Sequence, residues 1–123
     1  MPGWEFVDDK EKQEINNLFK FKKKGIKTPI FYNGKKVKSF ESKFANYVGS
    51  KFAICVTSGT AAIKIALLAA GIKPNDEVIT QSFTFIAVVE AIMDVGAKPI
   101  ITEVDETLNM CPLDLKKKIT KKT

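Results

Sequence analysis

The polar segment Thr57–Thr60 carries the side chains best suited to chemistry in this sequence. It follows a continuous apolar run and precedes an alanine-rich segment, so it is expected to join a buried strand to a helix. The first N–H groups of a helix have no partner within the helix and carry partial positive charge, and Gly59 would let an anion approach them closely. The hydroxyls of Ser58 and Thr60 suit a phosphate, but they are also common helix caps. Spacing alone leaves both interpretations open.

A second segment, Gln81–Phe85, is expected to join another strand to another helix. Loops that follow neighbouring parallel strands meet at one edge of the sheet, where α/β folds bind ligands. Phe83 or Phe85 could stack there on a planar ring, and core packing is the alternative role for either ring. Asp105 and Glu106 follow a third expected strand, and solvated surface is the simpler role for both carboxylates.

Composition excludes several kinds of site. The 123 residues include no histidine, and all 20 basic residues are lysine. Most zinc sites, every histidine-based catalytic triad and arginine forks for phosphate are therefore excluded, and no metal site is predicted. Gly59 has no partner glycine and no following Lys-Ser or Lys-Thr, so the segment is neither a Walker A loop nor a dinucleotide fingerprint.

The cysteine count, the length of the apolar runs and the first residues bear on the cellular compartment. Cys55 and Cys111 are too few for a disulfide framework, which favours the reducing cytoplasm. No apolar run reaches the roughly 20 residues that cross a bilayer. The opening Met1–Glu5 lacks the basic-then-apolar order of a signal peptide. A cytoplasmic protein without a membrane partner is expected.

The net charge of +6 raises the question of a nucleic-acid partner. The lysines concentrate in Lys20–Lys38 and Lys116–Lys122, and aromatic residues accompany the first stretch. A solvated connector is the simpler interpretation, and binding to single strands is the alternative.

Hydrophobic periodicity, glycine and proline outline the elements. Three apolar strands, each followed by a helix, predict a parallel sheet with covering helices in an α/β fold. Three strands are few for a sheet that averages about five or six, so an incomplete sheet is expected. The expected helices are 8–23, 40–48, 61–70, 84–95 and 112–119, with 61–70 buried nearly all round; the expected strands are 52–56, 77–80 and 99–104; and 25–39 is expected to be a loop or hairpin.

Several motifs in order resemble the DegT/StrS-type sugar aminotransferases, which are fold-type-I pyridoxal-phosphate enzymes. The resemblance extends from Pro2–Glu5 to Ile119–Thr120 and is carried by Thr57–Ala62, Asn75–Thr80, Phe83–Ala87 and Val95–Pro99. Pro2–Glu5 and Asp105–Met110 are most similar to the branch that includes 8-amino-3,8-dideoxy-octulosonate transaminases.

The resemblance implies the N-terminal part of a larger enzyme. Residues 1–39 would form an N-terminal helix and loop arm, and residues 40–123 an incomplete cofactor-binding large domain. The intact enzyme would be a homodimer that moves an amino group from an amino acid, glutamate in most of the family, to a keto-sugar or nucleotide-sugar. Cell-surface polysaccharide or nucleotide-sugar biosynthesis would be its setting.

The resemblance also assigns roles to residues. Gly59, Thr60 and Ala61 match the loop that binds the cofactor phosphate, with Ser58 beside them. Phe85 matches the aromatic residue that stacks on the cofactor ring, whereas Phe83 is expected to be packing. Lys64 does not match the lysine that holds the cofactor covalently.

The remaining catalytic groups are expected elsewhere. The cofactor-holding lysine and the aspartate that pairs with the ring nitrogen lie beyond Thr123 in the family, so no catalytic residue is expected here and the chain alone should be inactive. Cys111 stands where the family commonly has aspartate, so the last helix should be poorly capped.

Two alternatives stand beside this hypothesis. One is a non-catalytic module that binds phosphate or, through its lysines, nucleic acid. The other is a small nucleotide enzyme complete at this length, which the missing glycine fingerprint and the few strands argue against. An incomplete sheet also predicts an open edge and poor solubility of the isolated chain.

Overall fold

The computed structural model describes residues 3–19 and 34–123. The chain divides into two compact units, Met1–Cys55 and Val56–Thr123. The expected boundary between an arm and a large domain at residue 39 stays a prediction.

The first unit is helical. It contains a short 3-10 helix, η1 (Trp4–Phe6), followed by α1 (Asp9–Phe19). The start of α1 is a capping box, in which the Asp8 carboxylate accepts from the Lys10 N–H (2.7 Å) and the Asp8 N–H donates to Glu11 (2.8 Å). The predicted helix start is therefore confirmed, while residues 20–23 of the predicted helix lie outside the described residues.

Helix α2 (Lys35–Val48) begins five residues before the expected start at Phe40. Residues 35–39 are therefore helical, and the prediction of a loop there is wrong; residues 25–33 of that prediction lie outside the described residues. Lysine is a good helix former, and here it extends the amphipathic pattern toward the N-terminus. The helix ends at Gly49, whose φ of 71° allows its N–H to reach the Asn46 carbonyl (3.3 Å).

The apolar run 52–56 forms no strand, contrary to the prediction. Phe52 and Ile54 are both 78% exposed. A strand requires a neighbour to receive its N–H and C=O groups, and no described segment pairs with this one. Apolar composition suits a segment to burial, but it does not supply the partner strand.

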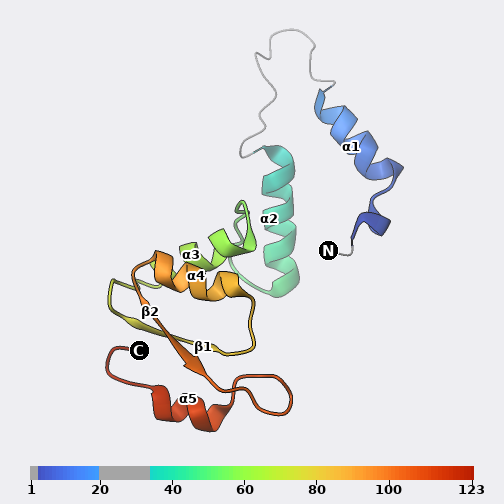
Figure 1. The fold of residues 1–123 in the computed structure, drawn as a ribbon. Coiled ribbons are helices and arrows are strands. Elements are labelled where there is room, and N and C mark those ends of the chain that lie inside the picture. The colour runs from blue at the N-terminus through green and yellow to red at the C-terminus, as the bar shows by residue number, and fades with distance from the viewer. Residues whose placement is uncertain (1–2, 20–33) are drawn as a thin grey trace. The chain divides into compact units, whose positions relative to one another are not determined.

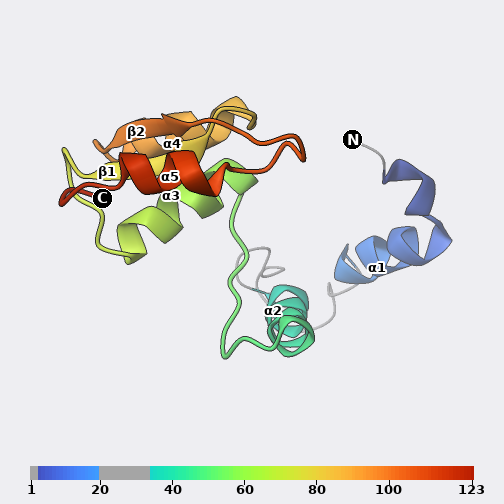
Figure 2. The ribbon, with the colours of Figure 1, turned by 90° about the horizontal axis from the view of Figure 1, so that it is seen from below.

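The second unit contains a parallel pair, β1 (Glu77–Gln81) and β2 (Lys98–Thr102), in which Ile79 is opposite Ile100. Helix α4 (Ile86–Asp94) connects the two strands, as expected for a crossover. Figures 1 and 2 show α4 on one face of the sheet and α5 (Pro112–Lys118) on the other. Among the described residues there are two strands rather than the three predicted, and the α/β layering is confirmed.

The core of the second unit lies between α4 and the sheet. Ile92, Val95 and Ala97 are its buried members, and Leu67, Ile72, Val78 and Val88 pack around them. Gly96 turns the chain from α4 into β2 with a φ of 79°, and a Cβ there would lie 3.3 Å from Pro74. The backbone turn and the close approach both require glycine at this position.

Helix α3 (Gly59–Ala69) packs against α4 but has no fully buried residue. The prediction that this segment is buried nearly all round is therefore wrong for this chain. Its alanines and leucines would suit cover on several sides, yet the described residues cover only the side that faces α4.

The two outer edges of the sheet differ. On the outer edge of β2, Pro99 has no N–H group to leave unpaired. Just after the strand, the Glu103 N–H donates to the Asp114 carboxylate and the Glu103 carbonyl accepts from the Cys111 N–H. The Ile101 carbonyl accepts from the Lys118 ammonium group (2.6 Å). On the outer edge of β1, the N–H groups of residues 79 and 81 point away from β2 and meet no acceptor among the described residues. At the start of β1 the Glu77 N–H donates to the Lys122 carbonyl (2.8 Å), so the open part of this edge is the stretch from residue 79 to residue 81.

None of the helices in the described ranges combines the length and the apolar character that crossing a membrane requires.

Candidate cofactor-binding site

The predicted phosphate-binding turn is the N-terminus of α3. Ser58 is the N-cap, and its hydroxyl oxygen accepts from the Ala61 N–H (3.1 Å), while its carbonyl accepts from the Ala62 N–H (3.0 Å). The N–H groups of Gly59 and Thr60 meet no acceptor in the described part of the chain. Ser58 thus performs the capping role, and two backbone donors remain directed beyond the helix end.

Gly59 has no structural reason in this chain to be glycine. Its φ does not lie in the left-handed region, and a Cβ built on it meets no heavy atom within 4 Å. Open space beside a glycine at a helix N-terminus is where an anion can approach the backbone. Ser58 alone supplies the side-chain cap, so this helix end has room for an anion beside the cap.

The Gln81–Phe85 turn begins the next helix. The Gln81 side-chain amide donates to the Phe83 carbonyl (2.7 Å), which ties the turn together. Phe85 is the N-cap residue of α4 and is 76% exposed, and Phe83 is 62% exposed. The expectation that Phe83 is a packing residue is therefore wrong for this chain, and Phe85 presents a ring that the core does not use.

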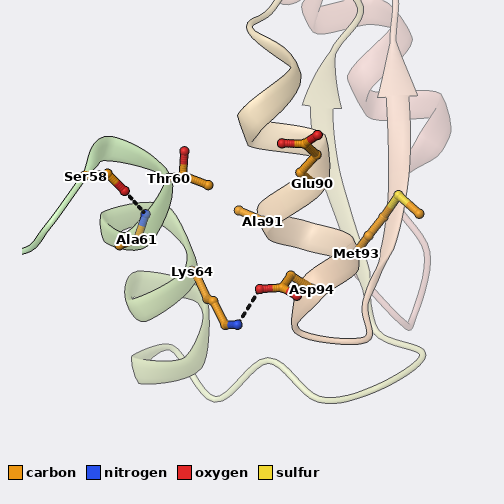
Figure 3. A pocket seen from close by; sticks show the side chains of 8 residues that line it. All are labelled: Ser58, Thr60, Ala61, Lys64, Glu90, Ala91, Met93 and Asp94. Carbon is orange, nitrogen blue, oxygen red and sulfur yellow. Dashed lines mark hydrogen bonds and ion pairs between the residues drawn. The ribbon is translucent and has the colours of Figure 1, made fainter.

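The two turns lie toward the same end of the second unit. Figure 3 shows α3 running from Ser58 toward Lys64 in the same direction as α4 runs from Glu90 to Asp94. The N-terminus of α4 follows the carboxyl end of β1, so that of α3 also lies toward that end. The prediction that the first turn follows a strand is wrong; α3 instead packs beside α4, and the two helices run in the same direction.

A groove of about 630 Å³ separates the facing sides of α3 and α4. Residues from both helices line it: Ser58, Thr60, Ala61, Lys64, Glu90, Ala91, Met93 and Asp94 (Figure 3). Lys64 forms an ion pair with Asp94 at one end of the groove. The groove holds two carboxylates and one ammonium group, so it does not favour an anion along its length, and the helix end is the better phosphate site.

Sequence reasoning did not single out Glu90 and Asp94. The two residues are four positions apart on a helix, a spacing that places them on one face, and this signal was available. What the sequence lacks is any sign that this face of α4 meets α3.

Of the two carboxylates that follow β2, Asp105 is hydrogen-bonded within a turn and Glu106 is exposed. Asp105 accepts hydrogen bonds from the backbone and the hydroxyl of Thr107, and the hydroxyl contact is the main reason that the pKa of Asp105 lies below its usual value. The turn includes Leu108 with a φ of 61°. Asp105 therefore organises a turn, while Glu106 is exposed, as expected. Most of the lysine-rich stretch 20–38 lies outside the described residues.

Comparison with known proteins identifies the family. The model of the DegT/DnrJ/EryC1/StrS aminotransferase family matches residues 9–123. GDP-perosamine synthase from Escherichia coli O157:H7 is 41% identical over 115 residues, which are 93% of this chain and 30% of that protein. The spore coat polysaccharide biosynthesis protein SpsC of Bacillus subtilis is 46% identical over 91 residues, covering 73% of this chain and 23% of SpsC.

Solved structures agree with this relationship. DesV from S. venezuelae has a TM-score of 0.85 at 31% identity and covers 98% of this chain and 31% of its own. Spr1654 from Streptococcus pneumoniae, in its PLP-form, has a TM-score of 0.82 at 29% identity, and the match covers 95% of this chain and 28% of Spr1654. The chain thus has the fold of part of a fold-type-I aminotransferase and spans between about a quarter and a third of these relatives' length. It belongs to the DegT/DnrJ/EryC1/StrS aminotransferase family, whose enzymes depend on pyridoxal phosphate.

Proposed function

We propose that this chain supplies the phosphate-binding turn and one wall of the cofactor site of a pyridoxal-phosphate-dependent sugar aminotransferase. The observation that carries the proposal is the α3 N-terminus, where Gly59 and Thr60 present N–H groups into space that a side chain at position 59 would otherwise enter. Family membership supports the chemistry.

The described residues fit the cofactor in two places. The Gly59 and Thr60 N–H groups and the Thr60 hydroxyl would hold the phosphate, while Ser58 and Ala61 keep the first turn of the helix closed. Phe85 would cover a face of the ring. When bound, pyridoxal phosphate supplies the electron-withdrawing ring that lets an amino group be exchanged for a keto group. The role of this chain is to bind and orient that ring.

The amino group would pass from glutamate to a keto-sugar carried on a nucleotide. Relatives named as GDP-perosamine synthase and as UDP-2-acetamido-2-deoxy-3-oxo-D-glucuronate aminotransferase support a nucleotide-linked substrate. We further propose that the intact enzyme is a cytoplasmic homodimer in nucleotide-sugar or cell-surface polysaccharide biosynthesis.

The chain alone should bind phosphate without transferring amino groups. Lys64, the lysine nearest the turn along α3, is paired with Asp94 and lies on the groove side of the helix. The lysine that holds the cofactor is proposed to lie beyond Thr123. The reading frame downstream of Thr123 should therefore encode another strand, an acidic residue and a later lysine; a frame that diverges from the family would contradict this.

The phosphate site is tested by substituting Gly59 with alanine. Pyridoxine 5′-phosphate is the suitable probe, because its alcohol replaces the aldehyde that would react with surface lysines. We expect ³¹P NMR titration to show a Kd roughly tenfold higher for Gly59→Ala, corresponding to the loss of a charge-assisted hydrogen bond of about 1.5 kcal/mol. The fold should be retained, since the added Cβ meets no neighbour.

Gly71→Ala is the matched control. Gly71 has a φ of 84° at the end of α3, so alanine there should strain the backbone while leaving phosphate binding unchanged. Equal affinity of the Gly59→Ala variant and the unmodified chain would remove Gly59 from the site.

A further inference from the structure

Helix α3 is attached to the second unit by limited contacts. None of its residues is fully buried, and its apolar contact with the core cluster comes from Leu67. Small residues, Ala61 and Ala91, line the groove where α3 faces α4, and they contribute little apolar area. In the part of the chain that the structure describes, the ion pair between Lys64 and Asp94 is the only hydrogen bond or ion pair between side chains of the two helices.

The position of Asp94 argues that this pair serves the contact between helices. Asp94 is the last residue of α4, where the helix carbonyls already create partial negative charge. A carboxylate at that end is unfavourable for α4 by itself. The positive charge of the Lys64 ammonium group offsets both the Asp94 carboxylate and the partial negative charge at the end of α4. An aspartate at this position is therefore accounted for by its ion pair with Lys64 and not by the stability of α4 itself.

Lys64 lies four residues after Thr60, one turn further along the same side of α3 (Figure 3). An ion pair at this position restrains both the rotation of α3 about its axis and its position beside α4. Those two variables decide where the Gly59 and Thr60 N–H groups point.

We propose that Lys64 and Asp94 are positioning residues for the phosphate-binding turn. Their ion pair holds α3 so that its N-terminus stays toward the end of the sheet at which Phe85 begins α4. What the turn binds rests on the proposed function; the positioning itself does not.

The experiment breaks the pair from each side and then rebuilds it. Lys64→Met and Asp94→Asn should each increase amide hydrogen exchange in the first turns of α3 by roughly two- to fivefold, the range of an exposed ion pair. The Kd for pyridoxine 5′-phosphate should rise by a similar factor. Lys64→Arg should leave the exchange rate in α3 and the Kd for pyridoxine 5′-phosphate as they are in the unmodified chain. The double variant K64E/D94K, which exchanges the two charges, should restore both quantities.

Lys73→Met is the matched control, since Lys73 is exposed and its side chain makes no ion pair with a described residue. It should change neither value. Unchanged exchange in both single variants, or a K64E/D94K variant no better than the single variants, would overturn the proposal. If exchange responds as expected but the unmodified chain does not bind the phosphate, the positioning role stands and the proposed function fails.

Discussion

Two glycines of the second unit differ in whether the backbone and its neighbours require glycine. Gly96 has a left-handed φ and lies against Pro74, so the local fold accounts for it completely. Gly59 has neither feature, and a side chain would fit there without contact. A glycine that its own fold does not require, at a helix N-terminus whose first two N–H groups meet no acceptor among the described residues, supports the proposal that the turn holds a phosphate.

Cys111 presents the opposite case, a residue poorly suited to its position. It is the N-cap of α5, and its side chain makes no capping hydrogen bond. Cys111→Asp should stabilise α5 by about 1 kcal/mol, because a carboxylate can accept from the first-turn N–H groups. The measurement is amide exchange in the first turn of α5. Cys111→Ala is the control, and an aspartate variant no more protected than the alanine variant would contradict the argument.

At the scale of elements, α5 closes the outer edge of β2 through Asp114. Its carboxylate accepts from the Glu103 N–H (2.9 Å) and pairs with Lys118 (2.8 Å). The Lys118 hydrogen bond, followed by the Glu103 N–H, holds the pKa of Asp114 below its ordinary value. One side chain thus joins a helix to a strand and to its own next turn.

This arrangement predicts a pH dependence. Because the pKa of Asp114 is lower in the folded chain than in the unfolded chain, its contribution is present above the ordinary aspartate value of about 3.9 and is lost as pH falls through the lowered folded value. Protection of the Glu103 amide, corrected for intrinsic exchange, should decrease over that acid range. Asp114→Asn should remove this decrease. Glu106→Gln, at an exposed carboxylate, should preserve it, and an unchanged pH profile in Asp114→Asn would exclude Asp114 as the titrating group.

At the scale of the whole chain, the second unit has more apolar surface than it can cover. Ile65 and Leu68 on α3 and Met93 on α4 are among its exposed apolar side chains, and beyond Glu77 the described residues leave the outer edge of β1 unpaired. A family member that spans between about a quarter and a third of its relatives' length is expected to show such surfaces.

The isolated chain should therefore bind the dye ANS, stay in solution only at low concentration and unfold over a broad temperature range, while keeping the local packing that the exchange and titration experiments probe. Within β1, the amides of Ile79 and Gln81 should exchange faster than those of Val78 and Thr80, because only the latter point toward β2. A sharp, reversible unfolding transition of a monomer would contradict the first expectation. Equal protection along β1 would contradict the second.

Local signals in the sequence were sufficient for most elements of the second unit. Apolar runs bounded by Pro74 and Gly96 predicted the strands 77–81 and 98–102 to within a few residues, and Pro112 marked the start of α5. The helix start at Ser58 was equally local, since a cap needs only its own first turn. The family, and with it the cofactor, followed from the order of the motifs.

Tertiary structure decided what depends on neighbours. The run 52–56 has the composition of a buried strand but forms none here, because strand formation needs a second strand to receive its backbone groups. Three further features depend on which surfaces pack together in the folded chain. They are the exposure of α3, the open part of the β1 edge and the ion pair between Lys64 and Asp94. Periodicity shows which face of an element is apolar or charged, whereas only the packed chain shows what lies against that face.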